Sequence, residues 1–467
     1  MTRFKLIKTG INKYKLAPII GMKADAFIYS NEGLLNSIYK DSSLEQLYEA
    51  STLTNIVSPV IGMPDIHEGF GLPIGGIMAT TGLISVGAVG MDINCGVRLL
   101  TSPLTYEKNI FSEKKLKNLI NQIETLIPVG LGGKHKQRLS LDLKKVTEDG
   151  VLHLVKKGYT PKKDLARIEE YGRMQEASYL SLSPHALKRA IKQVGTLGSG
   201  NHFIEIQKIE KVYDPFLAEK WGISDKQIAI MVHSGSRALG HQTCLDFTNL
   251  FWQLRDKYKI NVPKKGLASL PIDSPEGKKY FSAMAACVNF AFCNRAMMTY
   301  FIRQVFNKNF NCDLNLLYDV AHNIAKWENH QGKWLLIHRK GATRALPPNH
   351  PQNPKEYKET GHPAIVPGSM GTASYIMVGL PKIKETYCSI NHGAGRVMSR
   401  TQAKKQISEA EFKKIMGNIV YNKPFYKIAD EAPQAYKNIK EVINTLVKAG
   451  LTKKVAKLVP LAVIKGD

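Results

Sequence analysis

Short apolar runs that end in loops of glycine and histidine recur along this 467-residue chain. Three of them are IAIMVHSGSR (228–237), LNLLYDVAHN (314–323) and YCSINHGAGR (387–396). Apolar runs of this length, bounded by small residues, are typical of buried β-strands. Helical patterns alternate with them, which predicts a complex mixed α/β or α+β fold with central mixed β-sheets flanked by helices. Because side chains at strand ends can meet at one edge of a sheet, we expect a composite active-site cleft.

The sequence contains no repeat and no Pro/Ser-rich linker, which indicates one domain over residues 1–467. KKLKNLINQIETL (114–126) and KKDLARIEEYGRM (162–174) are both spaced for an apolar stripe. Residues from about 105 to 190 are therefore expected to form a helical peripheral lobe within the domain. FSAMAACVNFAFCNRAMMTYFI (281–302) is predicted to be a core helix, since its charge-free run is too short to cross a bilayer. The first hundred residues are predicted to be strands and turns, and the C-terminal stretch a helix or two followed by a strand.

The net charge of +26, from 65 Lys and Arg residues against 39 Asp and Glu, suits a polyanionic partner such as nucleic acid. A lysine-rich proteome explains the same excess equally well, so charge alone leaves both readings open. The six cysteines form no CxxC pair, and the N-terminal stretch lacks the apolar segment of a secretion signal. We therefore expect a reducing, cytoplasmic location. The uncharged stretch 69–91 is rich in glycine, which favours turns and buried strands over a membrane helix.

A candidate metal site begins with Asp92 and Cys95, three positions apart in VGAVGMDINCGVRLL. A carboxylate and a thiol on a loop between glycines can bend onto one cation, although a lone cysteine is more often a buried packing residue. His202, His233 and His322 each lie next to an apolar run, where a sheet can gather ligands. Each histidine alone could equally be a polar residue at a strand end. Together the five donors are too many for one tetrahedral ion and would serve two metals that share the thiolate.

His392 lies among small residues in SINHGAGRVMSR, with Arg396 four positions later. An imidazole there has room for a phosphoryl group, and arginine can bind phosphate through two hydrogen bonds. His392 is therefore a candidate nucleophile that forms a phosphoramidate; the alternatives are a further metal ligand or a structural residue. Upstream, VPGSMGTASYIM offers Ser369 and Ser374 at a tight turn as a phosphate or base cradle.

A basic group in IHRKGATRALPPN comprises Arg339, Lys340 and Arg344. It fits phosphate binding, although a solvated charged loop explains it nearly as well. GFGLPIGG (69–76) lacks the strand–turn–helix context of a dinucleotide fingerprint, and the sequence contains no P-loop motif. Any nucleotide is therefore expected to bind through another architecture.

Taken in order, the unusual motifs of the chain resemble those of the RtcB family of RNA ligases. They are MPDIHEGFGLPIGG (63–76), VGMDINCGVR (89–98), LGSGNHFIEIQ (197–207), HSGSRALGHQ (233–242), AHNIAKWE (321–328), HRKGATRALPP (338–348), PGSMGTASY (367–375), HGAGRVMSR (392–400), EAPQAYK (431–437) and VIKG (463–466). The stretch from about 105 to 190 is less distinctive. Two departures are small: Ser234 stands where a threonine is common, and Asp467 follows the Lys-Gly with which many relatives end. A carboxylate at Asp467 is expected to weaken a contact made by Lys465.

The resemblance implies a single RtcB-like catalytic domain that uses two manganese ions and GTP. It implies one ion held by Asp92, Cys95 and His202, and another held by Cys95, His233 and His322. It also implies that His392 takes GMP from GTP. The residues implied around the guanylate are Asn201, Glu205, Ser369, Ser374, Gly393, Ala394, Gly395, Arg396, Tyr436 and Lys465.

The reaction implied by the resemblance joins an RNA 3′-phosphate to an RNA 5′-hydroxyl, as in tRNA splicing or RNA repair. A 2′,3′-cyclic phosphate would first be opened to the 3′-phosphate. RNA and GTP are the expected partners, an activating protein is a further one, and the chain is expected to act as a monomer. Two other hypotheses stand beside this one: a metal-dependent phosphoesterase that acts on RNA ends without guanylylation, and a non-catalytic RNA-binding protein. The donor set argues against the latter, because a binding module needs no cluster of thiolate and imidazole groups.

Overall fold

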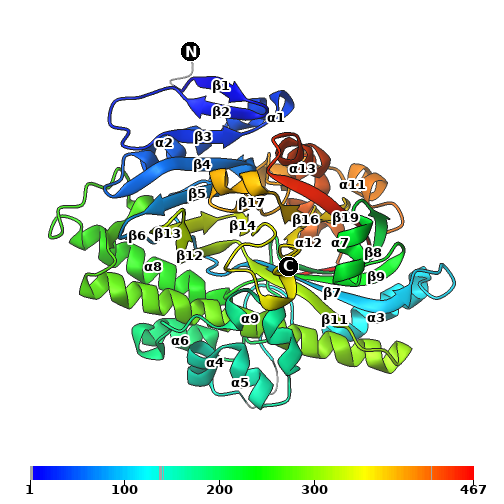
Figure 1. The fold of residues 1–467 in the computed structure, drawn as a ribbon. Coiled ribbons are helices and arrows are strands. Elements are labelled where there is room, and N and C mark those ends of the chain that lie inside the picture. The colour runs from blue at the N-terminus through cyan, green and yellow to red at the C-terminus, as the bar shows by residue number, and fades with distance from the viewer. Residues whose placement is uncertain (1–3, 136–138, 140, 422, 467) are drawn as a thin grey trace.

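Two large β-sheets form the centre of the protein, whose computed structural model describes residues 4–135, 139, 141–421 and 423–466 (Figure 1). Asp467 and its expected effect on Lys465 lie outside the described residues. The first sheet has seven strands in the order β1-β2-β3-β4-β5-β13-β12. Their bounds are β1 (Leu6–Gly10), β2 (Lys13–Leu16), β3 (Ala26–Tyr29), β4 (Ile56–His67), β5 (Ile74–Thr80), β13 (Lys333–Lys340) and β12 (Asn323–His330).

The second sheet has the order β11-β7-β9-β8-β19-β16-β15, and β18 pairs with β19. Its strands are β11 (Asn315–Ala321), β7 (Gly96–Thr105), β9 (Gln227–Ser234), β8 (Phe203–Val212), β19 (Thr452–Lys465), β16 (Ser374–Gly379), β15 (Ala364–Val366) and β18 (Val420–Tyr421). Two short pairings complete the described strands: β6 (Leu83–Ser85) with β10 (Ser269–Pro271), and β14 (Ala342–Arg344) with β17 (Ser389–Asn391). This arrangement confirms the predicted mixed α/β architecture.

Helices surround the two sheets (Figure 1). They are α1 (Glu32–Ile38), α2 (Ser43–Ser51), α3 (Glu113–Leu126), α4 (Leu143–Asp149), α5 (Val151–Lys156), α6 (Pro184–Ala190), α7 (Pro215–Trp221), α8 (Arg237–Leu254), α9 (Pro275–Phe310), α10 (Arg400–Gln406), α11 (Glu409–Met416), α12 (Phe425–Ile428) and α13 (Ile439–Lys448). The helices α1 and α2 lie in the first hundred residues, where only strands and turns were expected. The predicted C-terminal helix and strand are confirmed as α13 and β19.

The predicted core helix is confirmed as part of α9, which Figure 1 shows running beneath β7 and β11. Its start is well specified, because the Ser274 side chain accepts a hydrogen bond from the Gly277 N–H and Pro275 is the first helical residue. Apolar side chains of α9 share one core with those of α3, α4, α5 and α6. The helical stretch expected from about 105 to 190 is therefore packed directly against this central helix.

The prediction of a helix at 162–174 was wrong. The structure has two short 3-10 turns there, Lys162–Arg167 and Glu169–Gly172, with Glu170 at a positive φ of 55°. The reason is tertiary: the carboxylates of Glu169 and Glu170 lie 2.5 and 2.8 Å from Nζ of Lys326 on β12. Ion pairs with a buried lysine outweigh the local helical preference of this segment.

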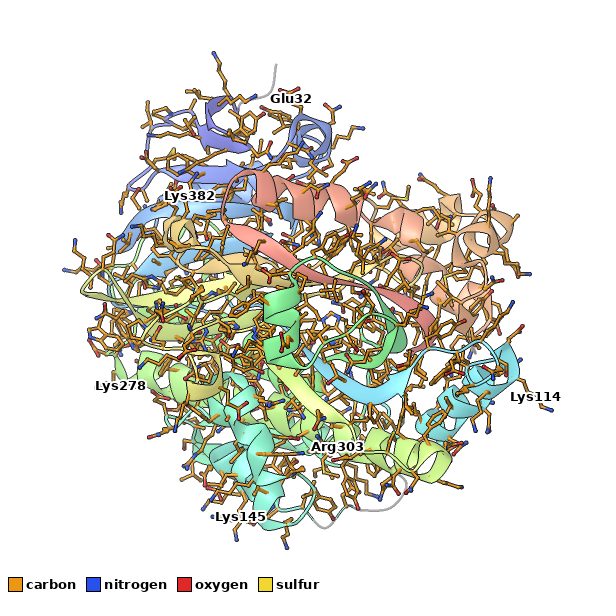
Figure 2. The ribbon with its side chains drawn as sticks, turned by 45° about the vertical axis from the view of Figure 1, so that its right-hand side comes forward. Glu32, Lys114, Lys145, Lys278, Arg303 and Lys382 are labelled. Atoms are coloured by element: carbon orange, nitrogen blue, oxygen red, sulfur yellow. The ribbon has the colours of Figure 1, made fainter. Side chains whose placement is uncertain are left out.

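Charged side chains spread over the outside of the protein, as the labelled Lys114, Lys145 and Lys278 show at the periphery of Figure 2. Within the described ranges, no helix combines the length and the apolar character that a bilayer crossing requires.

Candidate active site

Four neighbouring strands of the second sheet bring four predicted donors to one edge. Cys95 directly precedes β7 and His202 directly precedes β8, whereas His233 is the penultimate residue of β9 and His322 directly follows β11. Each of these strands is antiparallel to its neighbour in the order β11-β7-β9-β8. In such a sheet the start of one strand meets the end of the next, so the four side chains converge although they are far apart in the sequence.

The donor atoms form two groups that share the thiol. Sγ of Cys95 lies 3.2 Å from Nε2 of His233, which in turn lies 3.3 Å from Nε2 of His322. Sγ also lies 3.4 Å from Nε2 of His202, which is 2.7 Å from Oδ2 of Asp92. Within each group all donor atoms are within 4.8 Å of one another. We call Cys95, His233 and His322 the His322 site, and Asp92, Cys95 and His202 the His202 site.

The protonation of the His322 site suits a metal ion. Burial, together with neighbouring histidines, lowers the pKa of His233 and His322 well below the ordinary value, so both imidazoles are neutral. Burial and the Asp92 carboxylate raise the pKa of the Cys95 thiol well above its ordinary value. Neutral imidazole nitrogens and a buried sulfur that face one another at hydrogen-bond distance are the donors that a divalent transition metal prefers. A bound cation would reverse the thiol's preference, because metal coordination favours the thiolate.

Hydrogen bonds orient the His202 imidazole in the second donor group. Nδ1 of His202 lies 2.9 Å from the carbonyl oxygen of Leu197, which can only accept, so the proton is on Nδ1. The lone pair of Nε2 then points at the carboxylate oxygen of Asp92. Either a proton or a metal ion between these two atoms satisfies both, and backbone orientation of a histidine through its other nitrogen is typical of metal ligands. The residues present therefore fit two divalent ions.

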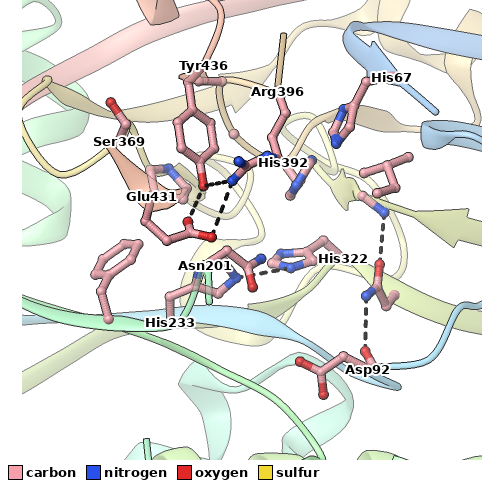
Figure 3. A pocket seen from close by; sticks show the side chains of 18 of the residues that line it. His67, Asp92, Asn201, His233, His322, Ser369, His392, Arg396, Glu431 and Tyr436 are labelled. Atoms are coloured by element: carbon pink, nitrogen blue, oxygen red, sulfur yellow. Dashed lines mark hydrogen bonds and ion pairs between the residues drawn. The ribbon is translucent and has the colours of Figure 1, made fainter. Parts of the chain in front are cut away.

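His392 lies beside these donors in a cavity of about 400 Å³ (Figure 3). Its ring centroid is 4.9 Å from that of His322. Nδ1 lies 2.7 Å from Oδ2 of Asp65, a side chain with no exposed surface, and the backbone N–H groups of His392 and Gly393 donate to the same oxygen. Gly395 packs so closely that a Cβ there would lie 2.2 Å from the carbonyl oxygen of Asp65. The Asp65 carboxylate thus fixes the tautomer that leaves Nε2 of His392 free for nucleophilic attack.

Most residues expected around a guanylate line this same cavity. They are Asn201, Ser369, Gly393, Ala394, Gly395, Arg396, Tyr436 and Lys465. Glu205 and Ser374 do not line it, but the side-chain amide of Gln207 donates to both, at 2.6 Å and 3.2 Å. Burial raises the pKa of Glu205 to about 8. The antiparallel pairing of β19 with β8 places Lys465 opposite Phe203 and so beside the strand ends that carry the donors.

Arg396 is held by protein groups at one wall of the cavity (Figure 3). Its Nη1 lies 3.2 Å from Oε1 of Glu431 and 3.1 Å from the hydroxyl of Tyr436, which also donates to Glu431. Nζ of Lys465 donates to the carbonyl of Gly200 at 2.5 Å and lies 3.7 Å from Glu431. The wall therefore combines two cations, one carboxylate and one aromatic ring, a set that can hold a phosphate and a base together.

The comparisons with known proteins agree over almost the whole chain. The family model of the tRNA-splicing ligase RtcB matches residues 46–466. A tRNA-splicing ligase RtcB of Methanococcus maripaludis is 42% identical over 464 residues, which cover 95% of each chain. The chain belongs to the RtcB family. A tRNA-splicing ligase RtcB of Thermococcus kodakarensis is 40% identical with 95% of each chain covered, and an RNA-splicing ligase RtcB of Mycobacterium tuberculosis is 41% identical over 90% of this chain and 100% of the relative.

The three basic residues that were expected to bind phosphate, Arg339, Lys340 and Arg344, lie in different surroundings in the structure. Arg339 has no exposed surface and forms a bidentate pair with Glu328, and Arg344 is buried against Glu169. Neither arginine lines the cavity, whereas Lys340 does. Nζ of Lys340 donates to two backbone carbonyls, and burial lowers its pKa to about 7. The two arginines therefore stabilise the fold, and only Lys340 is placed to meet a ligand.

A second cavity of about 620 Å³ adjoins the His202 site of the RtcB chain. It shares Met91 and Asp92 with the first cavity, so both cavities reach the Asp92 carboxylate. Its other lining residues are Leu131, Gly132, Lys134, Arg189, Gln193, His202, Arg237, Ala238 and His241. Its lining carries three basic side chains, Lys134, Arg189 and Arg237, beside the carboxylate of Asp92.

Three residues at or beside the site were not predicted from the sequence: Asp65, Glu431 and Arg295. Asp65 lies in MPDIHEGFGLPIGG (63–76), and Glu431 begins EAPQAYK (431–437), but neither carboxylate was predicted to act at the site. Arg295 lies in the predicted core helix, where its charge within an apolar run was the available signal. It proves to contact the carbonyls beside two of the donors, at Asn94 and Ser234.

Proposed function

We propose that this chain is a GTP- and manganese-dependent RNA ligase that joins RNA 3′-phosphate or 2′,3′-cyclic phosphate ends to 5′-hydroxyl ends. The observation that carries the proposal is the place of His392: its ring is 4.9 Å from the ring of His322, and Asp65 holds its Nδ1 proton. A nucleophile with a fixed tautomer thus lies beside two groups of metal donors. Membership of the RtcB family supports the same activity.

In the first step, Nε2 of His392 attacks the α-phosphorus of GTP, so an N–P bond forms and the bond to the pyrophosphate breaks. The imidazole becomes positively charged as it attacks, and the Asp65 carboxylate stabilises that charge through Nδ1. Manganese ions bound by the two donor groups would neutralise phosphate oxygens and make the phosphorus more electrophilic. Lys465 and Arg396 line the same cavity and would contact the nucleotide.

In the second step, an RNA 3′-phosphate oxygen attacks the bound GMP, and the N–P bond to His392 breaks. In the third step, the 5′-hydroxyl oxygen of the other RNA attacks the activated 3′-phosphorus and loses its proton, and GMP leaves. We propose that the RNA ends enter through the second cavity, because Arg189 and Arg237 line it and it opens on Asp92. A 2′,3′-cyclic end would first be hydrolysed at the same donors.

We also propose a cytoplasmic location. All six cysteines are free, which fits a reducing compartment.

The test is the mass of the intact protein after incubation with GTP and manganese. We expect covalent GMP on the unmodified chain, none on His392→Ala, and an undiminished adduct on the control His350→Ala, whose residue lies outside the cavity. An adduct that survives His392→Ala would refute the mechanism. The absence of any adduct, with release of phosphate from RNA 3′-ends in the absence of GTP, would favour the metal-dependent phosphoesterase instead.

A further inference from the structure

A single buried arginine of α9 connects the chain segments that carry one of the two donor groups. Arg295 has no exposed surface. Its Nη1 donates to the carbonyl oxygens of Asn94 and Ser234, each at 2.8 Å. Its Nε and Nη2 contact Oδ1 of Asp319 at 2.9 and 2.8 Å, and Nη2 also donates to Oδ1 of Asn94 at 3.2 Å. All of its donor nitrogens are thus used on three separate segments.

Two of the three contacts lie next to a donor of the His322 site, and the third is on the strand that leads to His322. Asn94 directly precedes Cys95, and Ser234 directly follows His233. Asp319 is on β11, the strand that ends just before His322. The planar guanidinium presents its donors in a fixed fork, so it sets the spacing of these segments more rigidly than a flexible ammonium group can. Arg295 on α9 therefore fixes the ends of β7, β9 and β11 relative to one another.

The His202 site has different supports. The carbonyl of Leu197 orients His202, and the Asn323 side chain donates to the carbonyl of Asp92 at 3.0 Å. Arg295 contacts neither Asp92 nor His202. The arginine is linked to this site indirectly, through the shared Cys95 and through Ser234, whose hydroxyl donates to the carbonyl of Leu197 at 2.7 Å.

We propose that Arg295 is a positioning residue for one ion only, the ion held by Cys95, His233 and His322. The ion at the His202 site depends on it only indirectly and stays bound when Arg295 is changed. This inference rests on the two-ion centre of the proposed function. It adds that one of the two ions depends on Arg295 for its binding. A change at Arg295 then converts a two-ion protein into a one-ion protein.

Arg98 provides a matched control. It is equally buried, and its Nε lies 2.7 Å from Oδ2 of the same Asp319. Its other described partner is the hydroxyl of Thr299 on α9, at 3.2 Å, and it contacts none of the segments at Asn94 and Ser234. Loss of either arginine disturbs the same buried carboxylate, but only Arg295 contacts the residues beside Cys95 and His233.

The experiment is a titration of the metal-free full-length chain with Co²⁺, followed by thiolate charge-transfer absorption and by the number of ions bound. The titration contains no GTP or RNA, so its result does not depend on ligase activity. A separate ligase assay that fails would count against the proposed function alone. We expect two ions on the unmodified chain, and one on His322→Ala, which serves as the one-ion reference. Arg295→Lys should match that reference, with the second ion bound at least tenfold more weakly. Arg98→Lys should bind two ions.

Three results would overturn the inference. They are two ions of unchanged affinity on Arg295→Lys, equal loss of both ions on that variant, or the same single loss on Arg98→Lys. Arg295→Gln is the second variant, because it keeps two hydrogen-bonding groups without the charge. Thermal unfolding of each metal-free variant separates metal loss from misfolding. If neither Arg295 variant folds, the arginine serves the fold as a whole and the assignment to one ion is wrong.

Discussion

Nδ1 of His392 lies 2.7 Å from Oδ2 of Asp65, a residue 327 positions away in the sequence. The same oxygen accepts hydrogen bonds from the backbone N–H groups of His392 and Gly393, at 3.1 and 3.3 Å. Three donors on one oxygen leave little freedom for the imidazole ring. Asp65 therefore controls both the orientation and the tautomer of the proposed nucleophile.

The first prediction follows from this pair. Asp65→Asn should slow covalent GMP formation by about 10²- to 10⁴-fold, because an amide cannot stabilise the imidazolium that forms as His392 attacks. GTP should still bind, since Asp65 itself does not line the cavity. Single-turnover labelling with radioactive GTP measures the rate. Asp25→Asn, on the surface, is the control, and an unchanged rate in Asp65→Asn would contradict the assigned role.

The second prediction concerns the shared sulfur. Cys95→Ala should lose bound manganese while the chain stays folded, because the thiol is the one donor common to both groups. The cost in the free energy of unfolding should be only about 1 kcal/mol, as for a small buried side chain. Metal analysis after dialysis, together with thermal unfolding, gives the two quantities. Cys244→Ala, also buried but in neither donor group, should keep its manganese; full occupancy in Cys95→Ala would mean that the site is misplaced.

The third prediction uses the buried carboxyl of Glu205, whose pKa burial raises to about 8 from an ordinary 4.5. Between pH 4.5 and about 8, Glu205 is therefore protonated in the folded chain and deprotonated in the unfolded chain. The contribution to stability is fully present below pH 4.5 and is lost as the pH rises through about 8. Glu205→Gln removes this dependence, because its amide does not titrate.

The measurement is the free energy of unfolding at about pH 6 and about pH 9. The unmodified chain should lose more stability between the two than Glu205→Gln does. Glu210→Gln, a more exposed position on the same strand, should behave like the unmodified chain. Identical pH dependence in Glu205→Gln would show that this carboxyl is already charged at neutral pH.

The sequence was informative where local pattern and chemistry coincide. His233 and His322 could be placed at strand ends because an apolar run and a small-residue loop flank each of them. The order of the strands could not be predicted, since antiparallel pairing between β11, β7, β9 and β8 depends on side chains far apart in the chain. The convergence of the donors at one edge follows only from that order.

Two failures have the same physical origin. The segment 162–174 has a helical pattern, but ion pairs of Glu169 and Glu170 with Lys326 impose another conformation. Arg339 and Arg344 have the composition of a phosphate site, but buried glutamates neutralise them. In each case a partner distant in sequence decided the outcome, and no local signal contained that partner.

The last prediction separates the two cavities. Arg189 lines the second cavity and donates to Gln242 at 2.8 Å, but it does not line the cavity of His392. If RNA ends enter there, Arg189→Ala should leave covalent GMP formation unchanged and slow the transfer of GMP to an RNA 3′-phosphate. Loss of one phosphate contact should also reduce the slope of log affinity against log salt by about 0.7 for single-stranded RNA.

Lys188→Ala is the matched control for this prediction, because the adjacent lysine is exposed and lies outside the cavity. It removes the same charge from the same helix, so a general loss of positive charge would affect both variants alike. Binding of a 3′-phosphate RNA at several salt concentrations gives the slope, and quenched-flow transfer from preformed enzyme–GMP gives the rate. Equal effects of the two changes would mean that RNA is attracted by net charge alone. A defect in GMP formation with normal transfer would place Arg189 with the nucleotide and leave the second cavity without a role in RNA binding.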